Sequence, residues 1–261
     1  MTSTNYNKLI IQVSLQKFSF CVKNQLSNEI LHYNSFLINQ LASLENQLES
    51  IFNKNELLQV SYSDVLVLHD NNLNTFVPET FFDERILGSY LQYNTKVFAT
   101  DFFIYDELEF HKMKNVYVPY VAYNNFFIDQ FGAFTYKHIN SNLVEYVLNA
   151  SKDIDDNLVY CNVSNDHFEI VVCNKNKLIL FNSFEIQTPE DFIYYVLFTY
   201  EQLKLNPEQT PVYLFGAIKK GDVNYQIIFN YIKNVYLINS DLIGKMENID
   251  TNHNNFILIH S

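Results

Sequence analysis

Residues 158–184, LVYCNVSNDHFEIVVCNKNKLILFNSF, contain three apolar runs with a short polar stretch between each neighbouring pair. The runs Leu158–Val163, Phe168–Cys173 and Leu178–Phe184 are rich in β-branched and aromatic residues, which favour strands. The polar stretches consist mainly of serine, asparagine, aspartate and lysine, which are typical of tight turns. Because strands joined by tight turns pair antiparallel, this region predicts a three-stranded antiparallel sheet.

A helix, a strand, a second helix and a last strand are predicted downstream. Thr188 is a good N-cap residue, Pro189 suits the first helical position, and apolar residues then recur at helical spacing. We expect a buried strand at Val212–Phe215, a helix from Asp222 to about Ile232 and a strand at Val235–Ile238. The second half of the chain therefore has the predicted order β-β-β-α-β-α-β.

The first half of the chain has the same predicted order. Tyr33-Asn34-Ser35-Phe36 closes its third strand, as Phe181-Asn182-Ser183-Phe184 closes the third strand of the second half. The predicted elements are strands Leu9–Leu15, Phe18–Val22 and Ile30–Leu37, a helix carrying Leu41, Leu44, Leu48 and Ile51, strand Val65–Leu68, a helical segment from Pro78 with Phe82, Ile86 and Tyr90, and strand Val97–Ala99.

The spacing of equivalent residues supports an internal duplication. Phe18 and Phe168 are 150 positions apart, whereas Val97 and Val235 are 138 apart. We therefore expect two related lobes, the second with shorter late loops. The predicted domains are residues 1–154, with an elaboration at about 101–150, and residues 155–261. Within the elaboration, two short helices are predicted near 120–131 and 141–150, and the closing run Phe256–Ile259 is interpreted as a strand.

The composition limits the classes of function. The chain has 261 residues and a formal net charge of -12, with 17 Lys and Arg against 29 Asp and Glu. Nucleic-acid binding needs a basic surface, so this class is disfavoured. The three cysteines lack metal or disulfide spacing. No secretory signal precedes the first strand and no stretch is long enough to insert into a membrane, so we expect a cytoplasmic protein with reduced cysteines.

The twofold β-β-β-α-β-α-β pattern resembles the superfold of actin, sugar kinases and heat-shock ATPases, which consists of two ribonuclease-H-like lobes. More narrowly, Phe76–Phe82 (FVPETFF) and the segment Phe134–Leu148 are similar to a family of uncharacterised bacterial proteins with an actin-like ATPase fold. The chain is also similar, in fold alone, to actin-like scaffolds of pilus and secretion machines. The expected fold class is thus mixed α/β, duplicated and actin-like.

This resemblance implies where a nucleotide would bind. Active members hold phosphates with Asp-x-Gly hairpin turns between the first two strands of each lobe, where glycine lets backbone amides approach the phosphates. The matching turns here, 14–17 and 164–167, contain no glycine. The adenosine-side turn that the family has after the fourth strand of the second lobe corresponds to Phe215-Gly216-Ala217, which has one glycine where a pair is typical. The candidate nucleotide-binding residues are Ser14, Lys17, Ser164, Asn165, Asp166 and Gly216. Only Asp166 offers a carboxylate for Mg²⁺.

Other motifs have simpler interpretations. Gly216–Gly221 has Walker spacing, but Asp222 and Val223 stand where Lys and Ser/Thr would hold phosphate and Mg²⁺, so a strand-to-helix turn capped by Asp222 is favoured. The 7 histidines show no metal-ligand spacing and fit strand ends or the surface. The aromatic run Tyr117–Phe134 fits either a partner-binding surface or core. An alternating strand, rather than a metal site, is favoured for the acidic cluster Asp101, Asp106, Glu107 and Glu109.

These observations favour a non-catalytic, actin-like binding or scaffold protein with degenerate nucleotide turns, a protein partner, no catalytic residue, no metal site and no cofactor. A weak ATP–Mg²⁺ binder, or an ATPase that uses Asp166, is the alternative. A metal-dependent nuclease on a ribonuclease-H-like lobe is a third hypothesis, which the acidic composition and the absence of clustered carboxylates in the first strands disfavour.

Overall fold

The computed structural model describes residues 6–98, 100–238 and 256–261. The chain forms two compact units, which we describe separately: unit 1 is residues 1–142 with 257–261, and unit 2 is residues 143–256. The domain boundary between residues 154 and 155, which the sequence indicates, stays a prediction.

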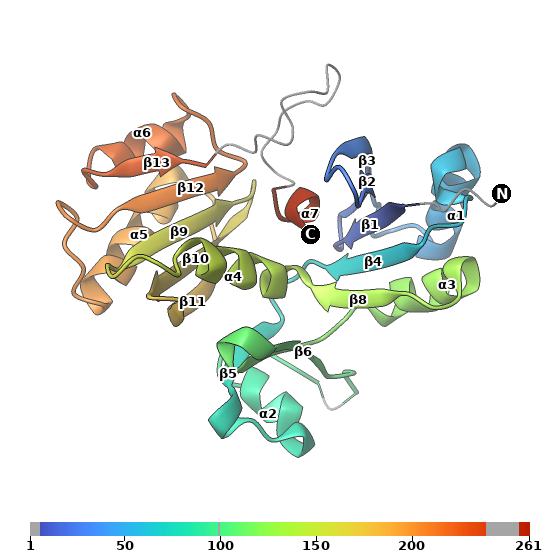
Figure 1. Ribbon diagram of the computed structural model, residues 1–261, viewed down its shortest axis with the longest axis horizontal. Helices are drawn as coiled ribbons and strands as arrows, with labels where there is room; N and C mark the ends of the chain where they lie inside the picture. Colours follow the sequence, from blue (N-terminus) through green and yellow to red (C-terminus); the bar gives the residue numbers. More distant parts are fainter. Residues whose placement is uncertain (1–5, 99, 239–255) are drawn as a thin grey trace. The chain divides into compact units, whose positions relative to one another are not determined.

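Unit 1 contains a five-stranded mixed sheet with the order β3-β2-β1-β4-β8 (Figure 1). The first three strands form an antiparallel meander, and β4 and β8 continue the sheet parallel to β1. This arrangement places the turn after β1 and the ends of β4 and β8 at the same edge of the sheet. The strands are β1 (Asn7–Val13), β2 (Lys17–Asn24), β3 (Ile30–Leu37), β4 (Asp64–His69) and β8 (Thr135–His138).

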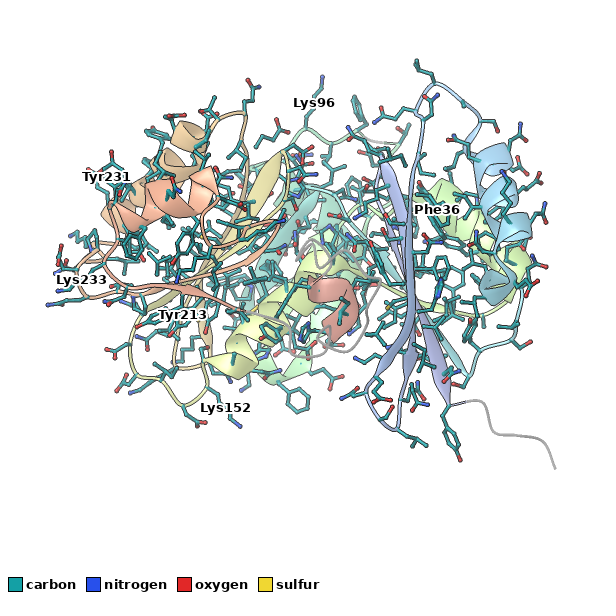
Figure 2. All side chains as sticks on the ribbon, turned by 90° about the horizontal axis from the view of Figure 1, so that it is seen from above. Phe36, Lys96, Lys152, Tyr213, Tyr231 and Lys233 are labelled. Atoms are coloured by element: carbon teal, nitrogen blue, oxygen red, sulfur yellow. The ribbon has the colours of Figure 1, made fainter. Side chains whose placement is uncertain are left out.

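Helices α1 (Leu44–Lys54) and α3 (Val121–Phe131) cover one face of this sheet. Phe36 extends from β3 to the same side (Figure 2), where its ring lies 6.2 Å from that of Phe18. The aromatic run predicted at Tyr117–Phe134 belongs largely to this core, through Tyr123 and Phe127 among others. Leu41 is the exception to the predicted helical face: it precedes α1 and is exposed, because Ser43 caps the helix.

A second, small antiparallel sheet with the order β5-β7-β6 is inserted in unit 1 between β4 and α3. Val77, Leu91 and Val116 form its own buried core. The insert consists of β5 (Asn74–Pro78), the 3₁₀ turns η2 (Glu79–Phe81) and η3 (Glu84–Ile86), α2 (Leu87–Leu91), β6 (Ile104–Leu108), η4 (Glu109–His111) and β7 (Met113–Tyr117).

This insert overturns the predicted fifth strand of unit 1. Val97 and Phe98 are not in a strand, and Ala99 lies outside the described residues. The fifth strand is β8, preceded by α3, so the additional segment begins at Asn74 rather than near residue 101. Leu66 and Tyr213 occupy equivalent positions in the fourth strands of the two sheets and are 147 positions apart. Their partners in the fifth strands, Thr135 and Tyr236, are only 101 positions apart. The difference is the length that the insert adds to the first copy.

Unit 2 has a sheet of the same topology, with the order β11-β10-β9-β12-β13. Helices α5 (Pro189–Gln202) and α6 (Val223–Phe229) pack on one face of it. Thr188 caps α5 as predicted, in a capping box with Asp191. The strands are β9 (Leu158–Val163), β10 (His167–Asn174), β11 (Lys177–Glu185), β12 (Val212–Gly216) and β13 (Val235–Leu237).

The registers of the two hairpins confirm the duplication. Val13 pairs with Phe18 at the end of the first hairpin, and Val163 pairs with Phe168 at the end of the second. Both second strands also have a register shift at the same place, after Val22 and after Val172. Phe18–Val22 and Phe168–Cys173 are therefore equivalent strands, and the mixed, duplicated α/β fold class is as predicted.

The remaining described elements are the 3₁₀ turn η1 (Glu56–Leu58), which follows α1, and two α-helices. Helix α4 (Ile139–Ala150) begins in unit 1 and continues in unit 2. The closing run Phe256–Ile259 was predicted to be a strand, and this prediction is wrong: the run lies in helix α7 (Phe256–His260). In unit 1, Lys23 Nζ donates a hydrogen bond to the Ile259 carbonyl at 3.2 Å, which satisfies a carbonyl at the end of this helix.

Cysteine chemistry agrees with the sequence analysis, since Cys21, Cys161 and Cys173 are free and buried. Burial raises the pKa of the Cys21 thiol to about 12, so this sulfur is not a reactive thiolate at neutral pH. Within the described part of the chain, none of the helices combines the length and the apolar character needed to cross a membrane.

Candidate functional site

The turn between β9 and β10 in unit 2 holds three of the candidate nucleotide-binding residues. Asn165 and Asp166 are exposed and Ser164 is half-buried; the Ser164 N–H donates to the His167 carbonyl at 2.8 Å. The carbonyl of Asp166 accepts a hydrogen bond from the Ile186 N–H at 2.8 Å. The turn is thus closed by its own backbone and fixed to the end of β11, without glycine.

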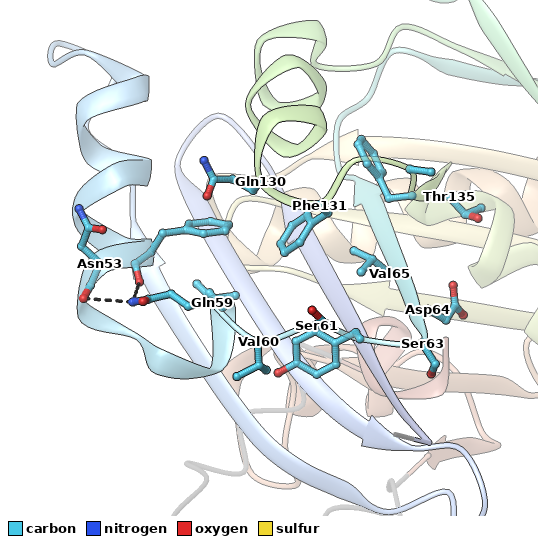
Figure 3. A pocket seen from close by; sticks show the side chains of 15 residues that line it. Asn53, Gln59, Val60, Ser61, Ser63, Asp64, Val65, Gln130, Phe131 and Thr135 are labelled. Carbon is cyan, nitrogen blue, oxygen red and sulfur yellow. Dashed lines mark hydrogen bonds between the residues drawn. The ribbon is translucent and has the colours of Figure 1, made fainter. Parts of the chain in front are cut away.

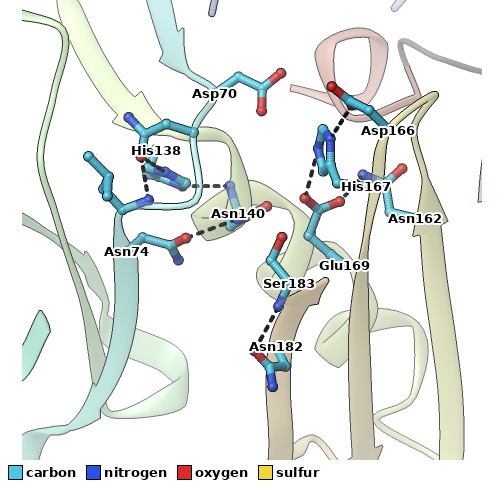
Figure 4. A network of polar contacts seen from close by, with 12 residues as sticks. Asp70, Asn74, His138, Asn140, Asn162, Asp166, His167, Glu169, Asn182 and Ser183 are labelled. Carbon is cyan, nitrogen blue, oxygen red and sulfur yellow. Dashed lines mark hydrogen bonds and ion pairs between the residues drawn. The ribbon is translucent and has the colours of Figure 1, made fainter. Parts of the chain in front are cut away.

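His167 lies between two carboxylates at this turn (Figure 4). Its Nδ1 is 2.7 Å from Asp166 Oδ1 and its Nε2 is 3.3 Å from Glu169 Oε1. Glu169 is buried, with Asn162 Nδ2 donating to its other oxygen at 2.8 Å. Because two acidic groups flank one imidazole, the site favours positive charge and repels the oxygens of a phosphate.

Gly216 ends β12 beside this turn, and its glycine identity has a reason within the protein. Its φ is +86°, and a Cβ there would lie 2.2 Å from the Val163 carbonyl oxygen. The following N–H, of Ala217, donates to the same oxygen at 2.5 Å. The close approach that Gly216 permits is therefore between β12 and β9. Asp222, predicted to cap α6, precedes that helix but accepts from the Lys219 N–H instead, at 2.8 Å.

The corresponding turn in unit 1 is also engaged in internal contacts. The Ser14 N–H donates to the Lys17 carbonyl at 2.9 Å, and the Gln16 carbonyl accepts from the Ile38 N–H at 2.8 Å. Tyr123 donates its phenol proton to the Ser14 carbonyl at 3.1 Å, which attaches the turn to α3. The structure thus places Ser14 and Lys17 in one hairpin turn, and Ser164, Asn165 and Asp166 with Gly216 in the equivalent region of unit 2.

Two polar residues beside the unit 1 turn were missed by the sequence analysis. Gln12 Nε2 donates to Asp70 Oδ2 at 2.8 Å, while Gln12 Oε1 is buried without a hydrogen-bond partner among the described residues. The Asp70 N–H donates to the Val13 carbonyl, as the Ala217 N–H does to Val163, so Asp70 and Ala217 are equivalent. A signal was present, because Asp70 directly follows a buried parallel strand, where ligand-binding carboxylates are common.

A buried polar network joins the insert of unit 1 to its main sheet. Asp106 on β6 accepts hydrogen bonds from the Ser141 hydroxyl (2.5 Å), the His138 N–H (2.7 Å) and the Tyr117 hydroxyl (3.0 Å). Asn74 Oδ1 accepts from Asn140 Nδ2 at 3.1 Å (Figure 4). Of the acidic cluster predicted to form an alternating strand with a solvated face, only Asp106 and Glu107 lie in β6, while Asp101 precedes it and Glu109 lies in η4. Asp106 is on the buried face, where it binds the start of α4.

Two buried histidines belong to the same region. The Asn140 N–H donates to His138 Nδ1 and the Tyr120 N–H donates to His69 Nδ1, both at 3.1 Å. Each ring therefore carries its proton on Nε2, which lies 3.3 Å from Asn71 Oδ1 in His138 and 3.1 Å from Asn124 Oδ1 in His69. Both histidines are neutral, strand-end residues that fix backbone N–H groups, and their role is structural.

We expect acid to destabilise unit 1. Burial lowers the pKa of His69 to about 4 and of His138 to about 3, so between about pH 6.5 and pH 4 the unfolded chain binds two protons that the folded unit does not. Burial raises the pKa of Asp106 to about 6, so the folded unit binds one proton there that the unfolded chain does not, and this offsets one of the two histidine protons. The free energy of unfolding should therefore fall with pH near pH 5 by the equivalent of one net proton, on the order of 1 kcal/mol per pH unit, measurable by hydrogen exchange of β4 and β8 amides.

Asp106→Asn provides the matched control for this pH dependence. It removes the proton that the folded unit binds near pH 6, so the slope of the unfolding free energy against pH should be about twice as steep near pH 5 as in the wild type. A slope that is the same in both proteins would show that Asp106 does not titrate with the fold.

The two cavities described here lie at the other end of the sheets. One, of about 630 Å³ in unit 1, is bounded by the ends of α1 and α3 and the starts of β4 and β8 (Figure 3). The other, of about 650 Å³ in unit 2, lies at the starts of β9, β12 and β13. Ligands of open α/β sheets bind beyond the carboxyl ends of the strands. Neither cavity is lined by a candidate residue, and the described residues contain no cluster of three potential metal ligands.

Two equivalent mixed sheets, each with helices on one face and a hairpin turn beside the end of its fourth strand, place the chain in the actin-like ATPase fold. A Bacteroides thetaiotaomicron protein of unknown function with this fold matches 99% of this chain and 97% of its own, with a TM-score of 0.82 and 22% identity. In the PilM–PilN type IV pilus biogenesis complex, one chain matches with a TM-score of 0.61 and 11% identity, over 97% of this chain and 96% of its own.

The chain belongs to the DUF3822 family of proteins of unknown function, whose family model matches residues 1–235. The family resemblance and the fold predicted from the sequence are both confirmed by these comparisons. No curated protein matches the chain.

Proposed function

We propose that this protein is a non-catalytic, actin-like binding or scaffold protein. The observation that carries the proposal is the state of the two hairpin turns, which contain no glycine and are closed by their own backbone. The one turn carboxylate, that of Asp166, pairs with His167. Phosphate binding would need freely approachable amides and a carboxylate available to Mg²⁺.

A binding or scaffold function implies that this chain has a protein partner. A relative in fold, in the PilM–PilN complex, takes part in type IV pilus biogenesis, and we infer a comparable role in protein assembly here. The acidic composition favours a partner of opposite charge and disfavours nucleic acid. We further propose a cytoplasmic location and two lobes that divide near residue 154.

We expect ATP–Mg²⁺ to leave the thermal unfolding midpoint unchanged. A ligand present at one hundred times its Kd would stabilise the folded protein by about 2.7 kcal/mol, a shift of several degrees for units of this size. Calorimetry of the full chain with and without millimolar ATP–Mg²⁺ measures this directly, and an ATP-binding protein of the same fold provides the positive control.

Asp166→Ala is the companion variant. Wild type and variant should show the same background rate of phosphate release, because neither hairpin turn has the glycine that would let backbone amides hold a phosphate. Mg²⁺-dependent hydrolysis by the wild type that disappears in Asp166→Ala would overturn the proposal of a non-catalytic protein.

ATP binding without hydrolysis is the second candidate function. The contact between Gln12 and Asp70 favours it, because it places a carboxylate beside the Ser14–Lys17 turn, together with a buried amide oxygen for which the described part of the chain supplies no hydrogen-bond donor. If ATP–Mg²⁺ raises the unfolding midpoint in the wild type but not in Asp70→Asn, this second function is supported.

A further inference from the structure

The insert of unit 1 ends in two aromatic side chains that nothing within the described chain covers. Pro78, the last residue of β5, and Leu108, the last residue of β6, both pair with Met113 at the start of β7. The turns η2 and η4 follow these residues directly and therefore lie at the same end of the small sheet. Phe81 in η2 is 74% exposed and Phe110 in η4 is 87% exposed.

The fold itself does not need these two rings. The neighbouring Phe82 fills the insert core, with its ring 4.7 Å from Tyr105 and 6.2 Å from Tyr90. The backbone of the tip is nevertheless held in place, since the Tyr90 hydroxyl donates to the Phe81 carbonyl at 2.6 Å and the Glu79 N–H donates to the Lys112 carbonyl at 2.9 Å. Exposed aromatic rings on a fixed backbone are characteristic anchors of protein interfaces.

The charges around the tip are predominantly acidic. Glu79, Glu84 and Glu109 are exposed, and none of them forms an ion pair with another described residue. Two of the three cations nearby are occupied, since Arg85 binds Asp83 through two nitrogens and buried Lys114 pairs with Glu107. The third, Lys112 after η4, is exposed and forms no ion pair with another described residue, so the carboxylates still outnumber the available positive charge. A partner that covers Phe81 and Phe110 would therefore meet unpaired carboxylates at the rim.

We infer that this tip, formed by Phe81, Phe110, Glu79, Glu84 and Glu109, docks a basic amphipathic segment of another protein. Such a segment offers apolar side chains to the two rings and Lys or Arg to the carboxylates. A second copy of this chain fits less well, because each copy carries a net charge of -12 and would repel the other. The inference rests on the proposed binding function and specifies the chemistry of the partner.

Fluorescence anisotropy with two synthetic helical peptides tests this inference. One peptide has leucine on one face and lysine on the other, and its counterpart has glutamate in place of every lysine. The 261-residue chain should bind the lysine peptide and not the glutamate peptide. Phe81→Ser with Phe110→Ser should weaken binding at least about tenfold. Glu79→Gln with Glu109→Gln should weaken it several-fold and reduce its dependence on salt.

The matched control is Tyr194→Ser with Phe198→Ser, which removes two exposed aromatic rings from α5 without changing the charge. This variant should bind as the wild type does. Equal losses in the two aromatic variants, equal binding of the glutamate peptide, or self-association that depends on Phe81 and Phe110 would each overturn the inference. Thermal unfolding of every variant establishes that it is folded, and the outcome of the ATP–Mg²⁺ experiment is independent of all of them.

Discussion

Asp106→Ala is expected to lower the free energy of unfolding of unit 1 by about 3 kcal/mol at pH 7. The substitution leaves the His138 N–H and the Ser141 and Tyr117 hydroxyls without their buried acceptor, at about 1–3 kcal/mol for each group that finds no other partner. It also relieves the burial of an ionised carboxylate, about 3 kcal/mol for a pKa raised to about 6. The first effect is the larger one, because a backbone N–H cannot turn to water.

The loss should be greater at pH 5 than at pH 7. At pH 5 most of the folded protein carries a protonated Asp106, so alanine then removes the hydrogen bonds without relieving a charge. Hydrogen exchange of the amides in β6, β7 and β8 measures the effect on unit 1. Asp106→Asn, which keeps an acceptor of the same shape, should stay within about 1 kcal/mol of wild type at pH 7, and the exposed Glu109→Ala should change stability by less than about 0.5 kcal/mol. A loss in Asp106→Asn as large as in Asp106→Ala would contradict the assignment.

The parts of the fold that the sequence predicts correctly are those whose signals are local. The hairpins of both units are specified by short apolar runs and the short polar turns between them, and their register follows from the turns. The Asn-Ser pair that recurs in the third strand of each unit makes the same local contact in both. The Ser35 N–H donates to Asn34 Oδ1 at 2.8 Å, and the Ser183 N–H donates to Asn182 Oδ1 at 2.9 Å.

The fifth strand of unit 1 could not be found in this way. Strands β4 and β8 are neighbours in the sheet but are separated in sequence by the whole insert and α3. The spacing of Phe82, Ile86 and Tyr90 imitates a helix, yet only Leu87–Leu91 is α-helical, because Asp83 uses its carboxylate to accept from the Arg85 N–H and close a 3₁₀ turn. Long-range pairing, rather than local propensity, decides this region.

In the candidate site, too, residues in local turns could be predicted from the sequence, and residues whose partners lie on other strands could not. Ser14, Lys17, Ser164, Asn165 and Asp166 were correctly placed in hairpin turns because such turns are visible in sequence, and their role in nucleotide binding stays a prediction. Gln12 and Glu169 were missed because they occupy inward positions in apolar strands, where only the cross-strand neighbours, such as Asn162 for Glu169, show that a polar residue is satisfied. Asp106 looked like part of a solvated acidic cluster for the same reason: its three donors come from β7, β8 and α4.

Gly216→Ala is expected to destabilise unit 2 by about 3–5 kcal/mol. The new Cβ would lie 2.2 Å from the Val163 carbonyl oxygen and 2.8 Å from the Val163 nitrogen, and both are backbone atoms of the central strand β9. Relief of this overlap requires β12 to move away from β9, which breaks the 2.5 Å hydrogen bond from the Ala217 N–H. The φ of +86° adds the conformational cost of a left-handed residue with a side chain.

Gly221→Ala is the matched control, since Gly221 lies in the same connection between β12 and α6, has a φ of +100°, and has open space around its Cβ position. It carries only the conformational cost, about 1 kcal/mol, and hydrogen exchange in β9 and β12 separates the two variants. The comparison also bears on function. A glycine kept for a nucleotide would tolerate alanine in the free protein and lose an ATP-dependent stabilisation, whereas a glycine kept for packing loses stability without any ligand. If Gly216→Ala is as stable as Gly221→Ala, the close approach to Val163 is not what requires glycine, and the ATP-binding alternative gains support.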